Sequence, residues 1–166
     1  MNAVIRESAA DFQLIPDDLW RIAPEENDAL PSLPNGAWLY PLVAWQKEAA
    51  AIRARGQKFG LWLKPDTPPI ALEALKANFV ADFALIALDF PVFTDGRAYS
   101  LARLLRERLG YTGELRAVGH VLLDTLLFTR RLGFDAWAMS ERQNAETALA
   151  HLRSLSQSHM MRHPYQ

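Results

Sequence analysis

Apolar residues follow two alternating patterns from residue 36 onward. Apolar runs typical of strands buried on both faces occupy residues 38–44, 59–63 and 83–88, and two further predicted strands, 115–118 and 134–138, are mainly apolar. Each run is followed by a segment whose apolar residues recur at helical spacing. Ser140, with Gln143 three residues later, has the pattern of a capping box that opens the last helix. The sequence therefore predicts five strand-plus-helix units.

Five such units predict an α/β domain with an open, mostly parallel five-stranded sheet and helices on both faces, as in flavodoxin-like or receiver-like folds. A partial (β/α) barrel is the alternative, because a closed eight-stranded barrel needs about 250 residues. Residues 1–35 are expected to form an N-terminal extension packed on the domain. Residues 36–155 form the α/β domain itself, and residues 156–166 are expected to be a flexible tail.

Charge and apolar content exclude several classes of protein. The formal net charge is −1, so no global positive field is available to gather nucleic acid. The longest apolar stretches are interrupted by Asp82 and Asp89, and they fall short of the roughly 20 residues that a membrane-spanning helix needs. Residues 1–11 are charged and do not resemble a secretory signal, so a cytoplasmic protein is expected.

Some chemistry is also excluded within this chain. The sequence contains no cysteine, so thiolate nucleophiles, disulfides and cysteine-ligated clusters are ruled out. His151, His159 and His163 lack a compact ligand spacing, and no metal site is predicted from them. No phosphate-binding loop or dinucleotide glycine fingerprint occurs, so the residues identify no cofactor.

Ligands of open α/β sheets bind where the parallel strands end, at their carboxyl ends. The residues expected there are Asp89, Thr94, Asp95, Gly96, Arg97, Tyr99, Ser100, Gly119, His120 and Ser140. Arg97 is unusual because a cation in the first turn of a helix opposes the helix dipole. Two explanations stay open: an internal salt bridge with Asp89 or Asp95, or a site for an anion such as phosphate, sulfate or sulfite.

The helix that follows carries charged side chains away from its leucine stripe, namely Arg103, Arg106, Glu107 and Arg108. These residues form either a solvated face with local ion pairs or a docking patch for an acidic protein surface. A nucleic-acid patch is the least favoured interpretation, because the overall charge is balanced.

Two features follow the fourth predicted strand. His120 and Asp124 stand four residues apart and would share a helix face, either as a helix-cap histidine or as a catalytic base with its orienting carboxylate. Residues 121–132 are apolar around most of the helix circumference. That helix is either deeply buried or pairs with a partner protein or a second subunit, as in a homodimer.

The segments Phe-Thr-Asp-Gly-Arg-Ala-Tyr-Ser at 93–100, Ala-Arg-Leu-Leu-Arg-Glu-Arg-Leu-Gly-Tyr at 102–111 and Gly-Glu-Leu-Arg-Ala-Val-Gly at 113–119 form one long motif. Together they resemble an uncharacterised bacterial family known as domain of unknown function 934 (DUF934). The likeness covers residues 38–139. It implies a place beside the assimilatory sulfite reductase, since members of the family are commonly labelled as oxidoreductases of sulfite reduction, but it assigns no catalytic residue.

The chain departs from the family pattern at four positions. An Asp is usual where this chain has His120, an Arg where it has Leu123, a Gln where it has Thr125 and often a Cys where it has Leu132. If a polar site normally includes those positions, this chain carries an altered version of it. The changes also make the helix more apolar, which favours a partner surface.

A looser likeness links the chain to receiver domains, through Asp89 at a strand end and the turn Asp95-Gly96. Residues 39–44 carry no acidic pair and residues 134–140 no lysine, so phosphotransfer is not expected.

Two hypotheses about function follow from the sequence. The first is a non-catalytic accessory protein of sulfite assimilation, which binds a component of sulfite reductase. The second is a small oxidoreductase of the same pathway that uses a diffusible cofactor such as a flavin near Asp89, Arg97 and His120. Whether the protein is an enzyme is left open at this stage.

Overall fold

The computed structural model describes residues 3–8, 11–25, 33–76, 82–92, 94–140 and 143–157, with only the backbone for residues 155–157. His159, His163 and the rest of the tail from residue 158 onward lie outside the described residues, as does Phe93 of the family motif.

The described strands form a single sheet. They are β1 (Val4–Ser8), β2 (Asp11–Ile15), β3 (Trp20–Ile22), β4 (Ala37–Pro41), β5 (Phe59–Leu63), β6 (Leu85–Phe90), β7 (Glu114–Gly119) and β8 (Ala136–Ala138). Their order across the sheet is β2-β1-β8-β7-β6-β5-β4-β3. Strands β3 to β8 are parallel, whereas β1 is antiparallel to both β8 and β2.

The helices of the described chain follow the parallel strands. They are α1 (Leu42–Ala54), α2 (Pro69–Glu73), α3 (Arg97–Arg103), the π-helical turn η2 (Leu104–Arg108), the 3₁₀ turn η3 (Leu123–Thr125), α4 (Leu126–Arg131) and α5 (Ala145–Gln157). The expected capping box at Ser140 is wrong, because α5 begins later. Asn144 caps it instead, and its Oδ1 accepts a hydrogen bond from the Thr147 N–H at 2.9 Å.

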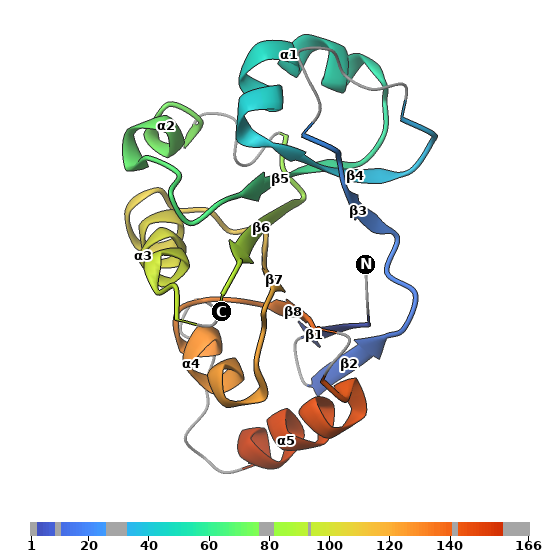
Figure 1. The fold of residues 1–166 in the computed structure, drawn as a ribbon, viewed down its shortest axis with the longest axis vertical. Helices are drawn as coiled ribbons and strands as arrows, with labels where there is room; N and C mark the ends of the chain where they lie inside the picture. The colour runs from blue at the N-terminus through green and yellow to red at the C-terminus, as the bar shows by residue number, and fades with distance from the viewer. Residues whose placement is uncertain are drawn as a thin grey trace.

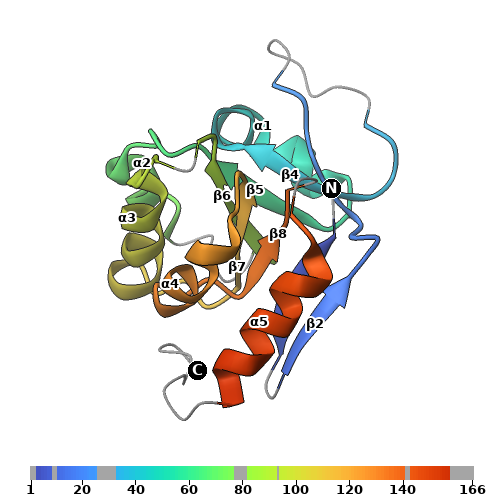
Figure 2. The same cartoon turned by 60° about the horizontal axis from the view of Figure 1, so that its bottom comes forward.

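The expected α/β class and open sheet are confirmed, but the expectation of five mostly parallel strands with helices on both faces is wrong, and the alternative partial barrel fits. The sheet has eight strands, is mixed and curls into a half-barrel with the helices around its outside (Figures 1 and 2). Strands β3 to β8 lie side by side in chain order, so right-handed crossovers place the connecting helices α1 to α4 on one face, and α5 packs in the same cluster. The antiparallel hairpin β1–β2, from the N-terminal region, extends the sheet beyond β8.

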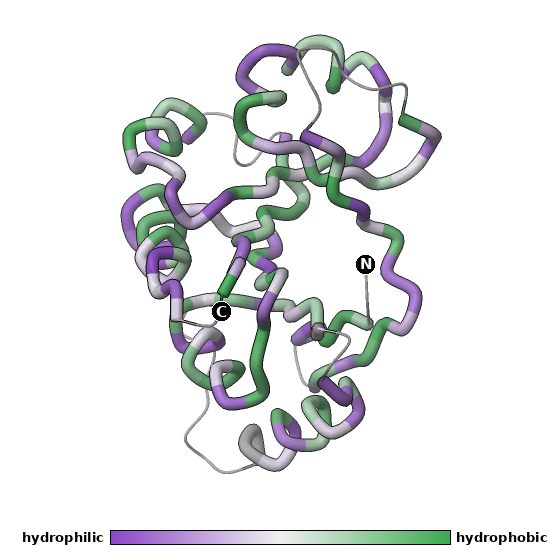
Figure 3. The backbone as a smooth tube through the Cα atoms, viewed as in Figure 1, coloured by the Kyte–Doolittle hydropathy of each residue, from purple (hydrophilic) through white to green (hydrophobic). Residues whose placement is uncertain are grey.

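Alternation along the strands gives the sheet two different faces. The convex face carries Ile5, Trp38, Leu61, Ile86, Leu88, Leu115 and Trp137, which pack in one cluster with the apolar residues of the helices. The helices therefore show hydrophilic and hydrophobic stretches in turn along the tube of Figure 3. The concave face carries Val4, Leu39, Leu85, Ala87, Val118, Ala136 and Ala138, with Ile15, Trp20 and Trp62 packed against them.

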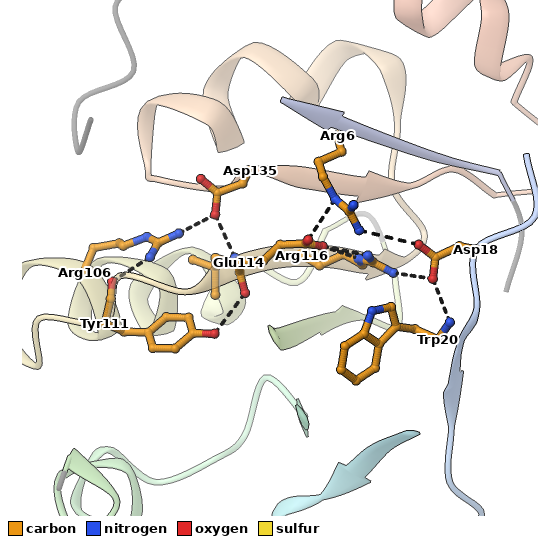
Figure 4. A network of polar contacts seen from close by, with 9 residues as sticks. Arg6, Asp18, Trp20, Arg106, Tyr111, Glu114, Arg116 and Asp135 are labelled. Atoms are coloured by element: carbon orange, nitrogen blue, oxygen red, sulfur yellow. Dashed lines mark hydrogen bonds and ion pairs between the residues drawn. The ribbon is translucent and has the colours of Figure 1, made fainter. Parts of the chain in front are cut away.

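A fully buried arginine lies on the concave face among these small and aliphatic residues. The Arg116 side chain has no exposed surface, and it pairs with Asp18 at 3.0 Å and Glu114 at 2.6 Å (Figure 4). Arg6 on β1 reaches the same Glu114 at 2.8 Å. Asp18 also accepts a hydrogen bond from the Trp20 backbone N–H at 2.8 Å. The network thus joins β1 and β7 to the segment that precedes β3.

That segment has a special position in the half-barrel. Residues 16–19 connect β2 to β3, which are the two edge strands of the sheet. The connection therefore crosses the open side of the curl (Figure 1). Asp18, with only 3% of its side chain exposed, fixes the connection to the sheet through Arg116.

We expect Asp18→Ala to lower the free energy of unfolding by about 3 kcal/mol, because it leaves a buried guanidinium without one of its carboxylates. Urea unfolding measures this loss. Asp11→Ala is the matched control, since Asp11 also pairs with an arginine, Arg153, but on the surface. The Asp11 variant should change little, and equal losses for both variants would contradict a structural role for the buried pair.

Candidate functional site

The parallel strands end together at one edge of the sheet, here called the carboxyl edge. Leu63 of β5 pairs with Leu88 of β6, so the next residues, Lys64 and Asp89, lie side by side at that edge. Asp89 in turn pairs with Val118 of β7. Since Leu85, Ala87 and Asp89 alternate with residues of the convex cluster, the Asp89 side chain lies on the concave face.

Asp89 is a half-buried carboxyl group to which no described side chain bonds. Burial raises the pKa of Asp89, and this effect outweighs the opposing influence of Lys64 and of the Phe90 backbone N–H. The other charged side chains of this face are paired, including Lys64, which contacts Glu25 at 2.6 Å. A carboxyl with a raised pKa and no ion-pair partner among the described residues, at the ligand-binding edge of a β/α sheet, is a candidate for a functional site.

Gly119 provides the space in which the Asp89 carboxylate lies. Its φ is +88°, a conformation that glycine adopts readily. A Cβ atom at this position would lie 2.7 Å from Asp89 Oδ1 and 2.6 Å from the Phe90 carbonyl oxygen. Both the backbone conformation and the close approach therefore require glycine at residue 119.

His120 and Asp124 do not share a helix face as expected. Leu122 is extended, with φ −106° and ψ 147°, and the first helical turn begins only at Leu123. His120 is exposed, and its backbone N–H donates to the Phe90 carbonyl at 2.7 Å. This bond holds His120 beside the end of β6, where the imidazole acts electrostatically on Asp89.

Arg97 forms the internal salt bridge that was one of its two explanations. Its guanidinium donates to Asp95 Oδ1 at 3.0 Å and to Oδ2 at 2.7 Å, and its backbone N–H donates to Oδ1 at 3.1 Å. The pair raises the pKa of Arg97 and lowers that of Asp95. Because the planar fork is already engaged by a carboxylate, the structure gives no support to the anion site. Thr94 and Gly96 lie exposed in the same turn.

The arginines of the following helix divide into two kinds. Arg103 pairs with Glu107 at 3.2 Å, and Arg108 pairs with Glu73 of α2 at 3.2 Å, both on the surface. This part of the charged face is therefore solvated and carries local ion pairs, which was one of the two interpretations of the sequence. Arg106 is different, because only 4% of its side chain is exposed.

Arg106 therefore cannot contribute to a docking patch. It donates to the carbonyls of Tyr111, Gly113 and Gly133 and pairs with Asp135 at 2.6 Å (Figure 4). The helix changes to a π turn at this point, where the Leu109 N–H donates to the Leu104 carbonyl at 3.0 Å. The helical spacing used for the sequence prediction does not hold in such a turn.

An open groove lies between α2 and α3, here called the α2–α3 groove. It is lined by Pro69, Ser100, Leu101, Arg103, Leu104, Glu107 and Arg108. The aliphatic members supply a mainly apolar surface, while the surface ion pairs of Arg103 and Arg108 lie at its sides.

A second exposed apolar feature belongs to α4. This helix is shorter than the expected 121–132; Leu126 is buried, whereas Phe128 is 49% exposed. The Phe128 ring contacts Tyr99 of α3 edge to face, with centroids 5.0 Å apart. One side of α4 is therefore buried, as one alternative expected, while pairing of the other side with a partner or second subunit stays a prediction.

Sequence reasoning missed Lys64 and Glu25 as neighbours of Asp89. Lys64 directly follows the second predicted strand, so the rule that identified Asp89 could also have found it. Glu25 had no comparable signal, because its contact with Lys64 joins residues 39 positions apart.

The chain belongs to the family described as "Bacterial protein of unknown function (DUF934)", whose model matches residues 60–164. Comparison with curated proteins and with solved structures found no match. Among the described residues, no helix has both the length and the apolar character needed to cross a membrane. The same part of the chain contains no group of three or more His, Asp or Glu residues arranged to hold a metal ion.

Replacing Arg106 with Met should lower the free energy of unfolding by about 3 kcal/mol, since it leaves Asp135 without its buried cation. Arg103→Met is the matched control on the same helix. Its exposed ion pair is expected to contribute roughly 0.5 kcal/mol or less. Chemical denaturation of both variants tests this, and a mild effect of the Arg106 variant would contradict its internal role.

Asp89→Asn should stabilise the fold at neutral pH. The folded-state pKa of Asp89 is raised above its ordinary value of 3.8, so its contribution to stability is fully present below that value and is lost as pH rises through the folded pKa. Asn cannot ionise, so the variant should gain thermal stability over the parent at pH 7 and little at pH 3.5. Thermal melts between pH 3.5 and pH 7 test whether the stability gained by the variant increases with pH. Asp17→Asn, at an exposed turn residue, is the control.

Proposed function

We propose that this protein is an accessory protein of assimilatory sulfite reduction, which binds a component of sulfite reductase through the α2–α3 groove. The pathway is what the family resemblance implies, and the groove is the observation that supports a binding role. An apolar centre with charged residues around it is the usual anatomy of a protein–protein interface.

The composition of the groove suits a protein partner. Pro69 and Ile70 of α2 are exposed and offer apolar area, Ile70 with 72% of its surface, whereas Leu101 and Leu104 are buried beneath the groove. The side chains of Arg103 and Arg108 are 60% and 70% exposed, so their ion pairs cost little to rearrange on binding. Arginine is also enriched among the residues that dominate binding energies.

Phe128 supports an additional contact on α4, which follows α2 and α3 along the same side of the sheet (Figure 1). Exposed aromatic residues are favoured at interface centres. A partner that spans several helices, or a second copy of this chain, would cover this ring and Tyr99.

The alternative, a small oxidoreductase that uses a flavin at the carboxyl edge, has weaker support. Flavin mononucleotide carries a phosphate, whereas the cations Lys64 and Arg97 at this edge are already paired with Glu25 and Asp95. Asp89 is the observation in its favour, since a carboxyl of raised pKa suits proton exchange. Flavin absorbance in the purified protein, or fluorescence quenching on titration, would support this alternative.

Ser100→Trp tests the groove, because Ser100 lies on α3, is exposed and lines the groove. The bulky ring should weaken capture of sulfite reductase components on the order of tenfold or more, as blocking an interface centre does. Ser154→Trp on α5 is the matched control, an exposed helical serine outside the groove.

Quantitative pull-down and titration with the intact reductase complex provide the measurement. Binding that survives Ser100→Trp would remove the groove from the proposal. Failure of the unaltered protein to bind any reductase component would overturn the proposed function itself.

A further inference from the structure

Three side chains meet where β5, β6 and β7 end. Lys64 and Asp89 lie side by side at the ends of adjacent strands, and His120 follows the end of the third. Lys64 and His120 each act on the Asp89 carboxylate electrostatically, so both lie near it. Lys64, with 46% of its side chain exposed, and His120 both reach solvent. A molecule in solution can therefore approach Asp89 from this edge.

Asp89 has unused capacity to accept hydrogen bonds. A carboxylate offers about four acceptor positions, and the bond described for Asp89 is from the Phe90 backbone N–H. Deeper in the concave face, Glu114 is engaged by Arg6 and Arg116. Among the described carboxylates of the concave face, Asp89 is therefore the one whose oxygens are available to a ligand.

The balance of charge around Asp89 determines which ligand fits. Lys64 contacts Glu25 at 2.6 Å, and Glu25, followed by the weaker influence of Asp66 and Asp89, raises the pKa of Lys64, so carboxylates outnumber ammonium groups at this edge. Arg97 does not alter this balance, because Asp95 neutralises it. An anion would therefore be repelled, whereas a cation would form an ion pair with the Asp89 carboxylate.

The geometry points to a binding site for a small organic cation, with a primary ammonium or guanidinium group held by the Asp89 carboxylate at the carboxyl edge. The ligand's N–H groups would donate to the free oxygens of Asp89, a charge-assisted contact stronger than a neutral hydrogen bond. Trp62, two residues before Lys64 on β5, would supply an aromatic wall. Lys64 Nζ already lies 5.5 Å from the centroid of this ring, so the ligand would share the ring with Lys64.

Thermal unfolding in the presence of n-butylamine and of agmatine tests this site, with butanoate and phosphate as anionic comparisons. At pH 7.5 the amines should raise the midpoint in proportion to the logarithm of their concentration, and the anions should not. The shift should disappear in Asp89→Asn and persist in Asp17→Asn. It should also weaken as the pH is lowered toward 3.8, because protonation of Asp89, whose pKa is raised by burial, removes the charge that the ligand needs.

The site is independent of the partner-binding proposal, so Ser100→Trp should keep the full amine shift even if it loses the reductase. Three outcomes would overturn the inference: no shift with either amine, an equal shift in Asp89→Asn, or stabilisation by phosphate or butanoate instead of the amines. Because Asn fits the same space and is expected to fold at least as well, loss of the shift in this variant cannot be attributed to unfolding.

Discussion

The burial of one guanidinium group constrains much of this structure. Arg116 lies on the concave face of a central strand without any exposed surface, so its charge must be met inside the protein. Glu114 comes from the same strand, but Asp18 comes from the connection between the two edge strands. The requirement for this second carboxylate holds the N-terminal region across the open side of the half-barrel.

The same constraint separates the concave face into two chemical zones. Arg6, Glu114 and Arg116 neutralise one another in its interior, where unpaired charge would be costly. Asp89 lies farther along β6, at the carboxyl edge, where solvent is accessible and no cation of the described residues forms an ion pair with it. The charged side chains that pair with one another thus lie in the interior of the concave face, and the unpaired Asp89 lies at its edge. The α2–α3 groove is on the opposite side of the sheet, which the helices cover.

Four arginines show how far the sequence predicts a role. Arg97 and Arg103 pair with carboxylates two and four residues away, and such local pairs follow from spacing alone. Arg106 and Arg116 instead find Asp135 and Asp18, which are 29 and 98 residues away. The local sequence does not reveal these distant partners, because they depend on which strands and turns of the fold lie beside Arg106 and Arg116.

The sequence by itself determined the alternation of strands and helices over β4–β8 and the position of Asp89 at a strand end. These features depend on apolar periodicity and on residues close in the chain. The tertiary structure decided the strand order, the single helical face, the antiparallel hairpin beside β8 and the burial of Arg106. Strand pairing joins segments far apart in sequence, and periodicity carries no information about which segments will meet.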